Sequence, residues 1–497
     1  MLLPIVGCSL KPDPITPAEH VRRAQDDYQK IISNNVPIDR PLSLSDVVAR
    51  ALKYNYDSEL SRQQISQQER QFDIALAQML PRLALNGGYN QRSNDPAAQS
   101  INVRTRQVSL DHAFSEEPKH YTAGPEFTWT VLDVGLGYLQ AKQQGFQSYV
   151  SVERRRKIIG DIVKRVQDSY WKALIAGSML PRLQPLLVRA EKVLASAQEA
   201  TRRQLSPDMP MLEFQREMMG VVGQLRHIES DLRNARAQLS TLINVPNGSA
   251  MQLSEKSWDL DVPQTDLNPR RLEEMGLALR PELREEAYQE QIDRQDIYKE
   301  IIKMMPGVGF LANFNYDTNK YLYNHTWASI GVQASFNLTN LIRGPRALAA
   351  AEQAVEVSKT RRLALSVAVL SQINLAFQQY THAVTDLKTA REVLAIERRI
   401  NRSSANALAA SSISEAEKVR RELALAIAEL SYFQSVTQTR FALVSLYISC
   451  GIDLVPPTVE IDDLEALSRA INPSITPWAN GLPPEITLPA PAGPSGT

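Results

Sequence analysis

One plan of residues occurs twice in this chain, about 225 positions apart, and this duplication restricts the possible folds more than any other feature. The segment 45–57 aligns with the segment 270–282, and Pro81 aligns with Pro306. Each copy is rich in Gln, Glu and Arg up to its proline, which is typical of a polar helix that a proline stops. The chain is therefore expected to contain two copies of one structural unit.

A strand-like stretch follows each proline, and a second one follows after a loop. Apolar residues alternate with small or polar residues over about 82–91 and 121–132 in the first copy, and over about 307–317 and 327–338 in the second. This period predicts strands whose two faces meet different surroundings. The offset between the copies falls from 225 to 206, so the first hairpin loop is 19 residues longer than the second. Strands of about 9–11 residues can cross a bilayer when tilted.

Helical sequence follows each strand pair. The 105 residues from Arg346 to Cys450 contain no Gly and no Pro. One continuous helix of that length would extend roughly 160 Å, so we expect a hairpin of two helices over 346–450. The first copy is expected to form the same hairpin over 136–244, with Pro181 and Pro185 interrupting and kinking its first helix.

The chain is thus expected to have five segments. An N-terminal segment (1–41) precedes the first repeat (42–244), a linker (245–268), the second repeat (269–454) and a Pro-rich tail (455–497). The composition of the tail predicts little regular structure. No run of about 18 apolar residues occurs, so no transmembrane helix is expected.

Four strands of membrane length cannot close a barrel by themselves. An open sheet edge in hydrocarbon leaves backbone groups unpaired at several kcal/mol each. Two copies of the chain would supply eight strands and three copies twelve, and the long polar helices favour three copies because their narrow apolar stripes need neighbours. A cytosolic coiled-coil protein is the competing interpretation, but it does not predict paired amphipathic strands at matching places.

The N-terminus contains a candidate lipidation site at Cys8. Residues 5–8, Ile-Val-Gly-Cys, match a bacterial lipobox, and Ser9 is compatible with sorting to an outer membrane. The segment is too short to be a full signal peptide. Either an upstream start is missing or the match is accidental.

Several motifs resemble those of the TolC-like outer-membrane factors, which serve tripartite efflux and type I secretion systems. Residues 277–283 are close to the "RPEL" helix start of that family, and residues 129–135 resemble its strand-to-helix signature "W-x-L-F-D-x-G". Residues 336–341 match more weakly, with Thr339 where the family often has Asp. The resemblance covers roughly 42–454, and the lipobox makes the chain similar to the lipidated, OprM-like branch.

The resemblance implies a mixed α and β membrane protein made of a duplicated helix–strand–strand–helix-hairpin repeat. Four strands per chain would form a trimeric, 12-stranded outer-membrane β-barrel that continues into a long periplasmic α-helical barrel. It also implies a lipid-anchored protein of the bacterial outer membrane. Its partners would be two further copies of itself, a periplasmic adaptor and an inner-membrane resistance-nodulation-division (RND) transporter.

The sequence contains no motif that we interpret as catalytic. The six histidines lack metal-ligand spacing, and no HExxH, GxxxxGK[ST] or GxSxG occurs. No enzyme activity, metal or cofactor is therefore expected, and Cys450 is expected to be a small buried hydrophobe. Charged residues balance at 55 against 55, which gives no electrostatic case for nucleic acid.

The resemblance also implies that the helix turns form a constricted end, closed by carboxylate–arginine links and rings of charge. Exposed charges at helix ends are the alternative interpretation of the same residues. The gate candidates near the two turns are Arg202, Arg203, Asp208, Glu213, Arg399, Arg402, Glu415 and Glu417. Of these, Arg402 and Glu415 are expected to face each other across the second turn. Small residues there are candidates for adaptor docking, namely Ser403, Ser404, Ala405, Ala407, Ser411 and Ser412.

The leading hypothesis is therefore a passive exit duct for drugs or other small molecules in a tripartite RND efflux system. Two alternatives stay open: the exit duct of a type I protein secretion system, and a pore-forming outer-membrane lipoprotein without a pump.

Overall fold

The computed structural model of the chain describes residues 13–33, 38–99, 101–102, 104–108, 113–114, 116–203, 208–246, 251–254, 267–409, 414–453, 455 and 463–479. The chain divides into two compact units. The hairpin unit consists of Met1–Leu60, Arg156–Arg280 and Val369–Thr497, and the sheet unit consists of Ser61–Arg155 and Pro281–Ala368.

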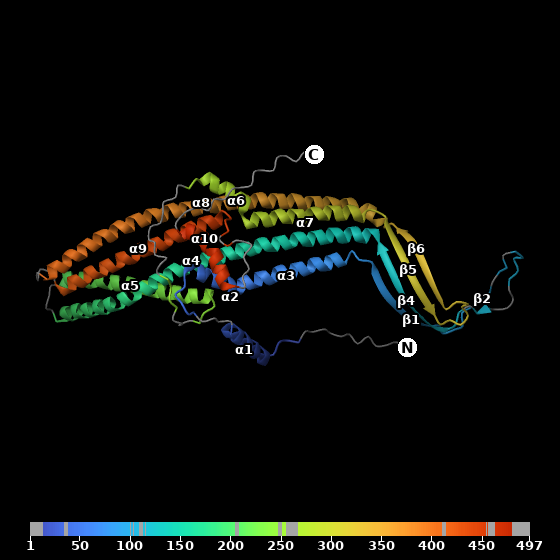
Figure 1. The fold of residues 1–497 in the computed structure, drawn as a ribbon, viewed down its shortest axis with the longest axis horizontal. Coiled ribbons are helices and arrows are strands. Elements are labelled where there is room, and N and C mark those ends of the chain that lie inside the picture. Colours follow the sequence, from blue (N-terminus) through green and yellow to red (C-terminus); the bar gives the residue numbers. More distant parts are fainter. Residues whose placement is uncertain are drawn as a thin grey trace. The chain divides into compact units, whose positions relative to one another are not determined.

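The two copies contain the same elements in the same order (Figure 1). The first has α2 (Leu44–Tyr54), α3 (Tyr56–Ala77), β1 (Arg82–Gln91), β4 (Lys119–Thr130), α4 (Val131–Arg202) and α5 (Asp208–Leu242). The second has α6 (Pro269–Leu279), α7 (Pro281–Lys303), β5 (Gly307–Asp317), β6 (Thr326–Ser335), α8 (Thr339–Ala409) and α9 (Glu415–Ser449). The remaining elements are α1 (Pro17–Ser33), α10 (Leu464–Ala479), and the short strands β2 (Ala97–Ala98) and β3 (Ala113–Phe114).

Equivalent residues end equivalent helices. Asn55 separates α2 from α3, and Arg280, 225 positions later, separates α6 from α7. The helices α5 and α9 are followed by residues in the left-handed conformation, Asn244 with φ 52° and Gly451 with φ 73°. At both ends the following N–H reaches back to a carbonyl of the last helical turn, which is the Schellman cap. The duplication therefore extends to the caps.

The "RPEL" motif has a structural role within the hairpin unit. The guanidinium of Arg280 donates to the carbonyl oxygen of Ser449 at 3.1 Å and to Oε1 of Gln372 at 2.5 Å. A cation thus satisfies the carboxyl end of α9, while Pro281 begins α7. A Cβ at Gly451 would lie 2.6 Å from the Arg280 nitrogen, so the close approach needs glycine there.

The strands of the sheet unit form one antiparallel sheet in the order β1-β4-β5-β6. Its register pairs Phe127 of β4 with Leu83 of β1 and with Ala312 of β5, and pairs Ala312 with Ile330 of β6. Residues with the same orientation therefore form one continuous face. β1 and β6 are the edge strands, each with one side that no described strand pairs.

One face of this sheet is apolar and uncovered. Leu85 is 83% exposed and Ile330 is 89% exposed, and the other large apolar residues of the face are also exposed. Aromatic residues lie near both ends of the face, where the rings of Tyr89 and Tyr121 are 4.9 Å apart and those of Trp129 and Phe310 are 6.0 Å apart. The opposite face carries mostly Asn, Gln, Ser, Thr and Gly.

The second strand of the first copy ends two residues earlier than the sequence predicts. The alternation predicts a strand over 121–132 and a helix from 136, whereas β4 and α4 meet between Thr130 and Val131. The hydroxyl of Thr130 donates to the carboxylate of Asp133, which lies in the first turn of α4. This local contact overrides the period-two pattern.

The same correction applies to the second copy. The predicted strand 327–338 ends three residues early, and α8 begins at Thr339 rather than at 346. The backbone N–H of Thr339 donates to the side-chain oxygen of Asn337 at 3.0 Å, so Asn337 starts the helix. α8 consequently includes Pro345 near its beginning.

The predicted interruption of the first long helix is wrong. α4 is one helix of 72 residues that contains both Pro181 and Pro185. Each proline removes a backbone hydrogen bond. The surrounding residues Met179, Leu183 and Leu187 are buried in the core, and this packing keeps the segment helical.

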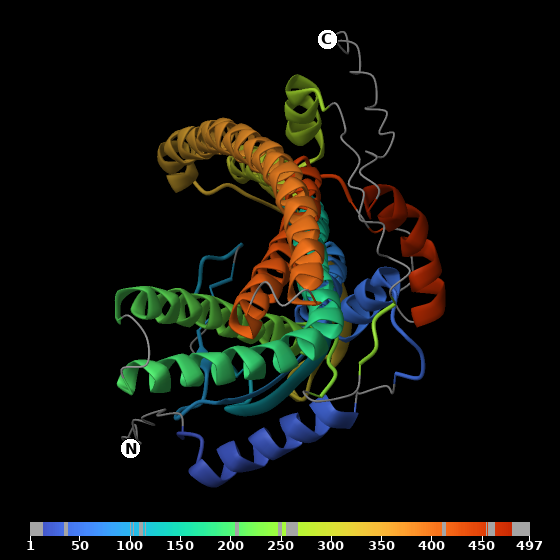
Figure 2. The same cartoon turned by 90° about the vertical axis from the view of Figure 1, so that its left-hand side faces the viewer.

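Two clusters of buried apolar residues connect the long helices of the hairpin unit among the described residues. The larger cluster joins apolar residues of α4, α5 and α9, with Leu183, Leu225 and Leu423 at or below 1% exposure. The smaller cluster joins Leu387 and Leu394 of α8 to α9. α8 and α9 run side by side in Figures 1 and 2. α9 thus packs against three other helices.

A helix in the C-terminal segment is a further correction. The Pro-rich tail was expected to lack regular structure, but α10 packs on α2, as Figure 2 shows. Leu467 and Ile471 are fully buried, and the hydroxyl of Ser468 donates to Oδ1 of Asp46 at 2.8 Å. This burial stabilises a helix that local composition does not favour.

The linker residues that the structure describes also contact the first copy. Leu42 and Leu253 form a parallel bridge. None of the helices in the described part of the chain combines the length and apolar character needed to traverse a bilayer.

Candidate functional site

The helix turns of the hairpin unit carry most of the residues singled out from the sequence. α4 ends at Arg202 and α5 begins at Asp208, while α8 ends at Ala409 and α9 begins at Glu415. Ser414 caps α9, because its hydroxyl accepts a hydrogen bond from the N–H of Glu417 at 3.2 Å. The carboxylates of Glu415 and Glu417 lie in the first turn of α9, where the helix dipole favours negative charge.

The gate candidates at the first turn form only local contacts. Arg202 and Arg203 pair with Glu199 of the same helix at 3.4 and 2.7 Å, and both arginines are exposed. Such surface pairs contribute about 0.5 kcal/mol or less. Glu213 is exposed. Asp208 begins α5, but its side chain lies outside the described residues.

The gate candidates at the second turn differ from one another. Arg399, Arg402 and Glu415 are exposed, and none of them forms an ion pair with another described residue. The expected link between Arg402 and Glu415 is therefore not formed within the described part of the chain. Glu417 instead pairs with Arg421 at 2.7 Å and with Arg420 at 3.2 Å.

Only part of the proposed docking set can be placed. Ser403 is exposed, whereas Ser404 is 9% exposed and donates to the carbonyl of Asn401 at 2.9 Å. The side chains of Ala405 and Ala407 lie outside the described residues, as do Ser411, Ser412 and the lipidation candidate Cys8.

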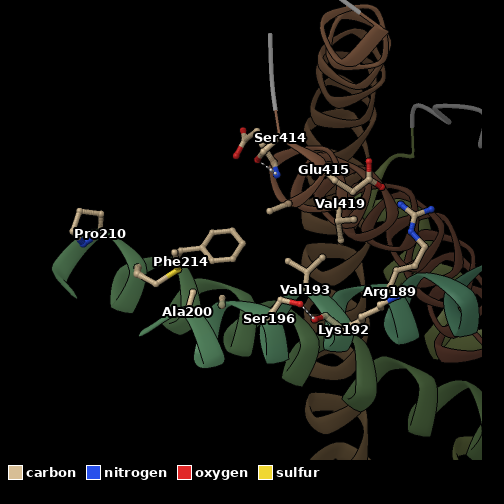
Figure 3. A pocket seen from close by; sticks show the side chains of 14 residues that line it. Arg189, Lys192, Val193, Ser196, Ala200, Pro210, Phe214, Ser414, Glu415 and Val419 are labelled. Atoms are coloured by element: carbon tan, nitrogen blue, oxygen red, sulfur yellow. Dashed lines mark hydrogen bonds between the residues drawn. The ribbon is translucent and has the colours of Figure 1, made fainter. Parts of the chain in front are cut away.

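A pocket of about 830 Å³ lies where α4, α5 and α9 approach one another (Figure 3). Its apolar lining includes Val193, Phe214 and Val419, and Arg189 and Glu415 supply opposite charges. The α4 side of this pocket was not anticipated, because no sequence signal indicates which part of α4 lies opposite the start of α9.

Ion pairs between helices, which sequence reasoning missed, connect α9 to its three neighbours. The carboxylate of Glu429 lies 3.5 Å from both Arg182 of α4 and Arg398 of α8. Farther toward the turns, Glu422 pairs with Arg189 of α4.

The third neighbour, α5, is reached through Arg420, which pairs with Glu217 at 3.0 Å. Burial would lower the pKa of Arg420, but Glu217 and Glu417 raise it above its usual value. The run of Glu and Arg at helical spacing in α9 is the signal that could have pointed to these links. Its partners on other helices are set by tertiary packing.

The described residues show no arrangement suited to metal chemistry. No group of three His, Cys, Asp or Glu among them could hold a metal ion. Cys450 is fully buried, and burial raises the pKa of its thiol to about 12, so it is not a nucleophile near neutral pH.

The chain is similar to a known sequence family and to several solved channels. Residues 47–245 match the family described as outer membrane efflux protein. Among curated proteins, none matches the chain by sequence.

Three of the similar structures are bacterial outer-membrane proteins. The CmeC channel of Campylobacter jejuni has a TM-score of 0.62 at 11% identity, over 88% of this chain and 90% of that one. The MtrE channel of Neisseria gonorrhoeae, in its open state, has a TM-score of 0.61 at 13% identity, over 82% and 88%. The protein VceC of Vibrio cholerae has a TM-score of 0.58 at 12% identity, over 82% and 96%.

At identities this low, the structural similarity shows a common fold. Residues 47–245 thus resemble outer membrane efflux proteins, which are transport ducts rather than enzymes, and over 82–88% of its length the chain has the fold of outer-membrane channels.

Proposed function

We propose that this protein is a trimeric exit duct of the outer membrane that conducts small molecules passively out of the periplasm. The observation that carries the proposal is the uncovered apolar face of the four-stranded sheet, with aromatic residues near both of its ends. A soluble protein rarely exposes such a face to water. We infer that the face contacts the hydrocarbon of a bilayer.

The spacing of the aromatic residues along β4 supports a sheet that spans a bilayer. Tyr121 and Trp129 are eight residues apart on β4, which is roughly 27 Å along the strand. At a tilt of about 40° this corresponds to roughly 21 Å across the bilayer, close to the apolar band between the aromatic girdles of outer-membrane barrels.

The edges of the sheet support association of several chains. β1 and β6 have 10 residues each and run in opposite directions, so β6 of one copy can pair with β1 of the next in the antiparallel sense. Three copies then close a 12-stranded barrel and leave a lumen lined by the polar face.

The long helices also need neighbours that a single chain lacks. Leu363, Val367 and Leu375 of α8 are exposed by more than half of their surface. Three copies would cover such apolar stripes, so that the helices continue the barrel as a periplasmic tunnel. The turns of α4–α5 and α8–α9 would form its periplasmic end, where the gate candidates lie and an adaptor would dock.

We further propose that the duct works in a tripartite system with a periplasmic adaptor and an RND transporter. Lipidation at Cys8 would favour this system over type I protein secretion, which is the alternative. Lipid at Cys8 is accessory in this proposal, because one acyl chain binds a membrane only weakly. Cys8→Ser behind a heterologous cleavable signal should therefore still insert in the outer membrane.

Light scattering of the detergent-solubilised protein tests the assembly, and bilayer conductance tests the duct. A trimer that conducts ions in planar bilayers is expected. A stable monomer, or a trimer without conductance even after substitution of the gate candidates, would refute the proposal. Co-purification with the adaptor of an RND pump, rather than with that of an ATP-driven transporter, separates efflux from secretion.

A further inference from the structure

The polar face of the sheet carries few full charges. His120 lies on this face and is charged only when protonated. Apart from it, Arg82, Glu126 and Asp317 are the only charged side chains among the described residues of this face in the four main strands. The register places them at different heights. Arg82 pairs with Thr128, and Asp317 pairs with Thr122.

Glu126 therefore lies two residues of β4 beyond the height of Arg82, and Asp317 lies four residues farther still. No ion pair joins Glu126 to Arg82 among the described residues. Each chain thus contributes one positive charge nearer the helices and two negative charges beyond it.

Glu126 is held in place by neutral donors. The side-chain amide of Asn86 donates to one carboxylate oxygen at 2.7 Å, and the hydroxyl of Thr128 donates to the other at 3.2 Å. Neutral donors orient the carboxylate but leave its charge uncompensated.

Its neighbour in β5 adds to the negative potential. Asn313 is the register partner of Glu126, and its buried Oδ1 accepts no hydrogen bond from any described residue. A carboxylate and an unsatisfied carbonyl oxygen are thus adjacent on this face. A cation is the species that both would attract.

We infer that Glu126, assisted by Asp317, gives the strand-lined part of the duct a preference for cationic over anionic permeants, and that Arg82 opposes it. The inference rests on the proposed trimeric duct, in which each of these residues forms a ring of three around the lumen. Rings of charge select permeants by electrostatics at close range. The favoured substrate class is cationic or zwitterionic small molecules.

The expected size of the effect follows from Coulomb's law. A unit charge at roughly 10 Å in water-like surroundings changes the local concentration of a monovalent ion about two-fold. Salt screens the interaction, because the Debye length is about 10 Å at 0.1 M and shorter in more concentrated solution. The preference should therefore weaken as the salt concentration rises.

Reversal potentials in planar bilayers under a KCl gradient test the inference. Glu126→Gln removes three charges from the trimer, and each of them acts in opposite senses on cation and anion, so the permeability ratio of K⁺ to Cl⁻ should fall about five-fold at 0.1 M salt. Arg82→Gln should raise the ratio by a similar factor. Glu126→Asp, which keeps the charge, should retain most of the wild-type ratio. Gln333→Asn on the same face is the neutral control and should leave the ratio unchanged. Contributions from the rest of the path are common to all variants.

The outcomes separate the two proposals. Conducting trimers of Glu126→Gln with the wild-type ratio would overturn the selectivity and leave the duct intact. If Glu126→Gln fails to insert, Arg82→Gln decides, because an unchanged ratio in that variant also excludes selection by these charges. Trimers that do not conduct even after substitution of the gate candidates would refute the duct and, with it, this inference.

Discussion

Glu429 offers the sharpest test of how the helices of the hairpin unit are held together. Its carboxylate, 12% exposed, lies 3.5 Å from Arg182 and 3.5 Å from Arg398, so that α9 connects α4 to α8 through one side chain. Glu429→Gln keeps the size of the side chain and removes the charge. The two arginines are more than half exposed and remain hydrated after the change.

Because water screens both arginines, each lost pair should cost about 0.5–1 kcal/mol, or about 1–2 kcal/mol together. Local opening of α9 should then be more frequent by a factor of about 5 to 30. Amide hydrogen exchange of the purified protein, followed by mass spectrometry on peptides of α9, measures this factor directly.

Glu199→Gln is the matched control. Its partners, Arg202 and Arg203, are exposed and lie on α4 like Glu199 itself, so its loss removes no contact of α9 and should leave the exchange of the α9 peptides unchanged. If α9 exchanges no faster in Glu429→Gln than in this control, the links between helices do not stabilise the hairpin unit and the reasoning is refuted.

Four other expectations can be checked with substitutions or reagents. If the exposed Arg402 and Glu415 pair between chains of the proposed trimer rather than within one chain, Arg402→Ser combined with Glu415→Ala should increase bilayer conductance without loss of the trimer; unchanged conductance would mean that other residues form the constriction. Cys450 should resist iodoacetamide at pH 8 until the protein unfolds, and mass spectrometry with and without denaturant would detect the adduct. Burial raises the pKa of Cys450 from 9.0 to about 12, so its contribution to stability is present below pH 9 and is lost as the pH rises toward 12; unfolding that is equally pH-dependent in Cys450→Ala would contradict this. Burial acts to raise the pKa of Asp46, but hydrogen bonds from Ser43 and Ser468 lower it, so the contribution of Asp46 is present above pH 3.8 and is lost on further acidification. Ser468→Ala should therefore lower the free energy of unfolding by about 1 kcal/mol. On acidification, α10 of the variant should become open to proteolysis at a higher pH than α10 of the wild type. If α10 is protected equally in both proteins, the contact does not stabilise it.

Local sequence was sufficient to predict an element where one strong signal acts within a few residues. Pro81 and Pro306 stop a helix, and β1 and β5 begin just after them. The strand alternation is local too, because successive side chains of a strand point to opposite faces. Because the plan of residues occurs twice, each element could be predicted from two separate stretches of sequence. Together these signals indicated strand pairs with one apolar face and long helical hairpins.

Where two local signals of equal strength compete, only the folded structure decides which element forms. The alternation over 121–132 continues into residues that also fit a first helical turn, and the contact of Thr130 with Asp133 decides where the helix starts. Pro181 and Pro185 predicted an interruption, but burial of the residues beside them keeps α4 continuous.

Contacts between distant segments were beyond the reach of the sequence. The composition of α10 indicates a tail, yet Leu467 and Ile471 become helical by packing on α2, some 420 residues away in the chain. The candidate gate shows the same limit. Position near a turn identified Arg402 and Glu415, which do not pair within the described part of the chain, whereas Glu429 pairs with arginines on two other helices. An ion pair depends on which helix faces align, and only the packing of α9 against its neighbours sets that alignment.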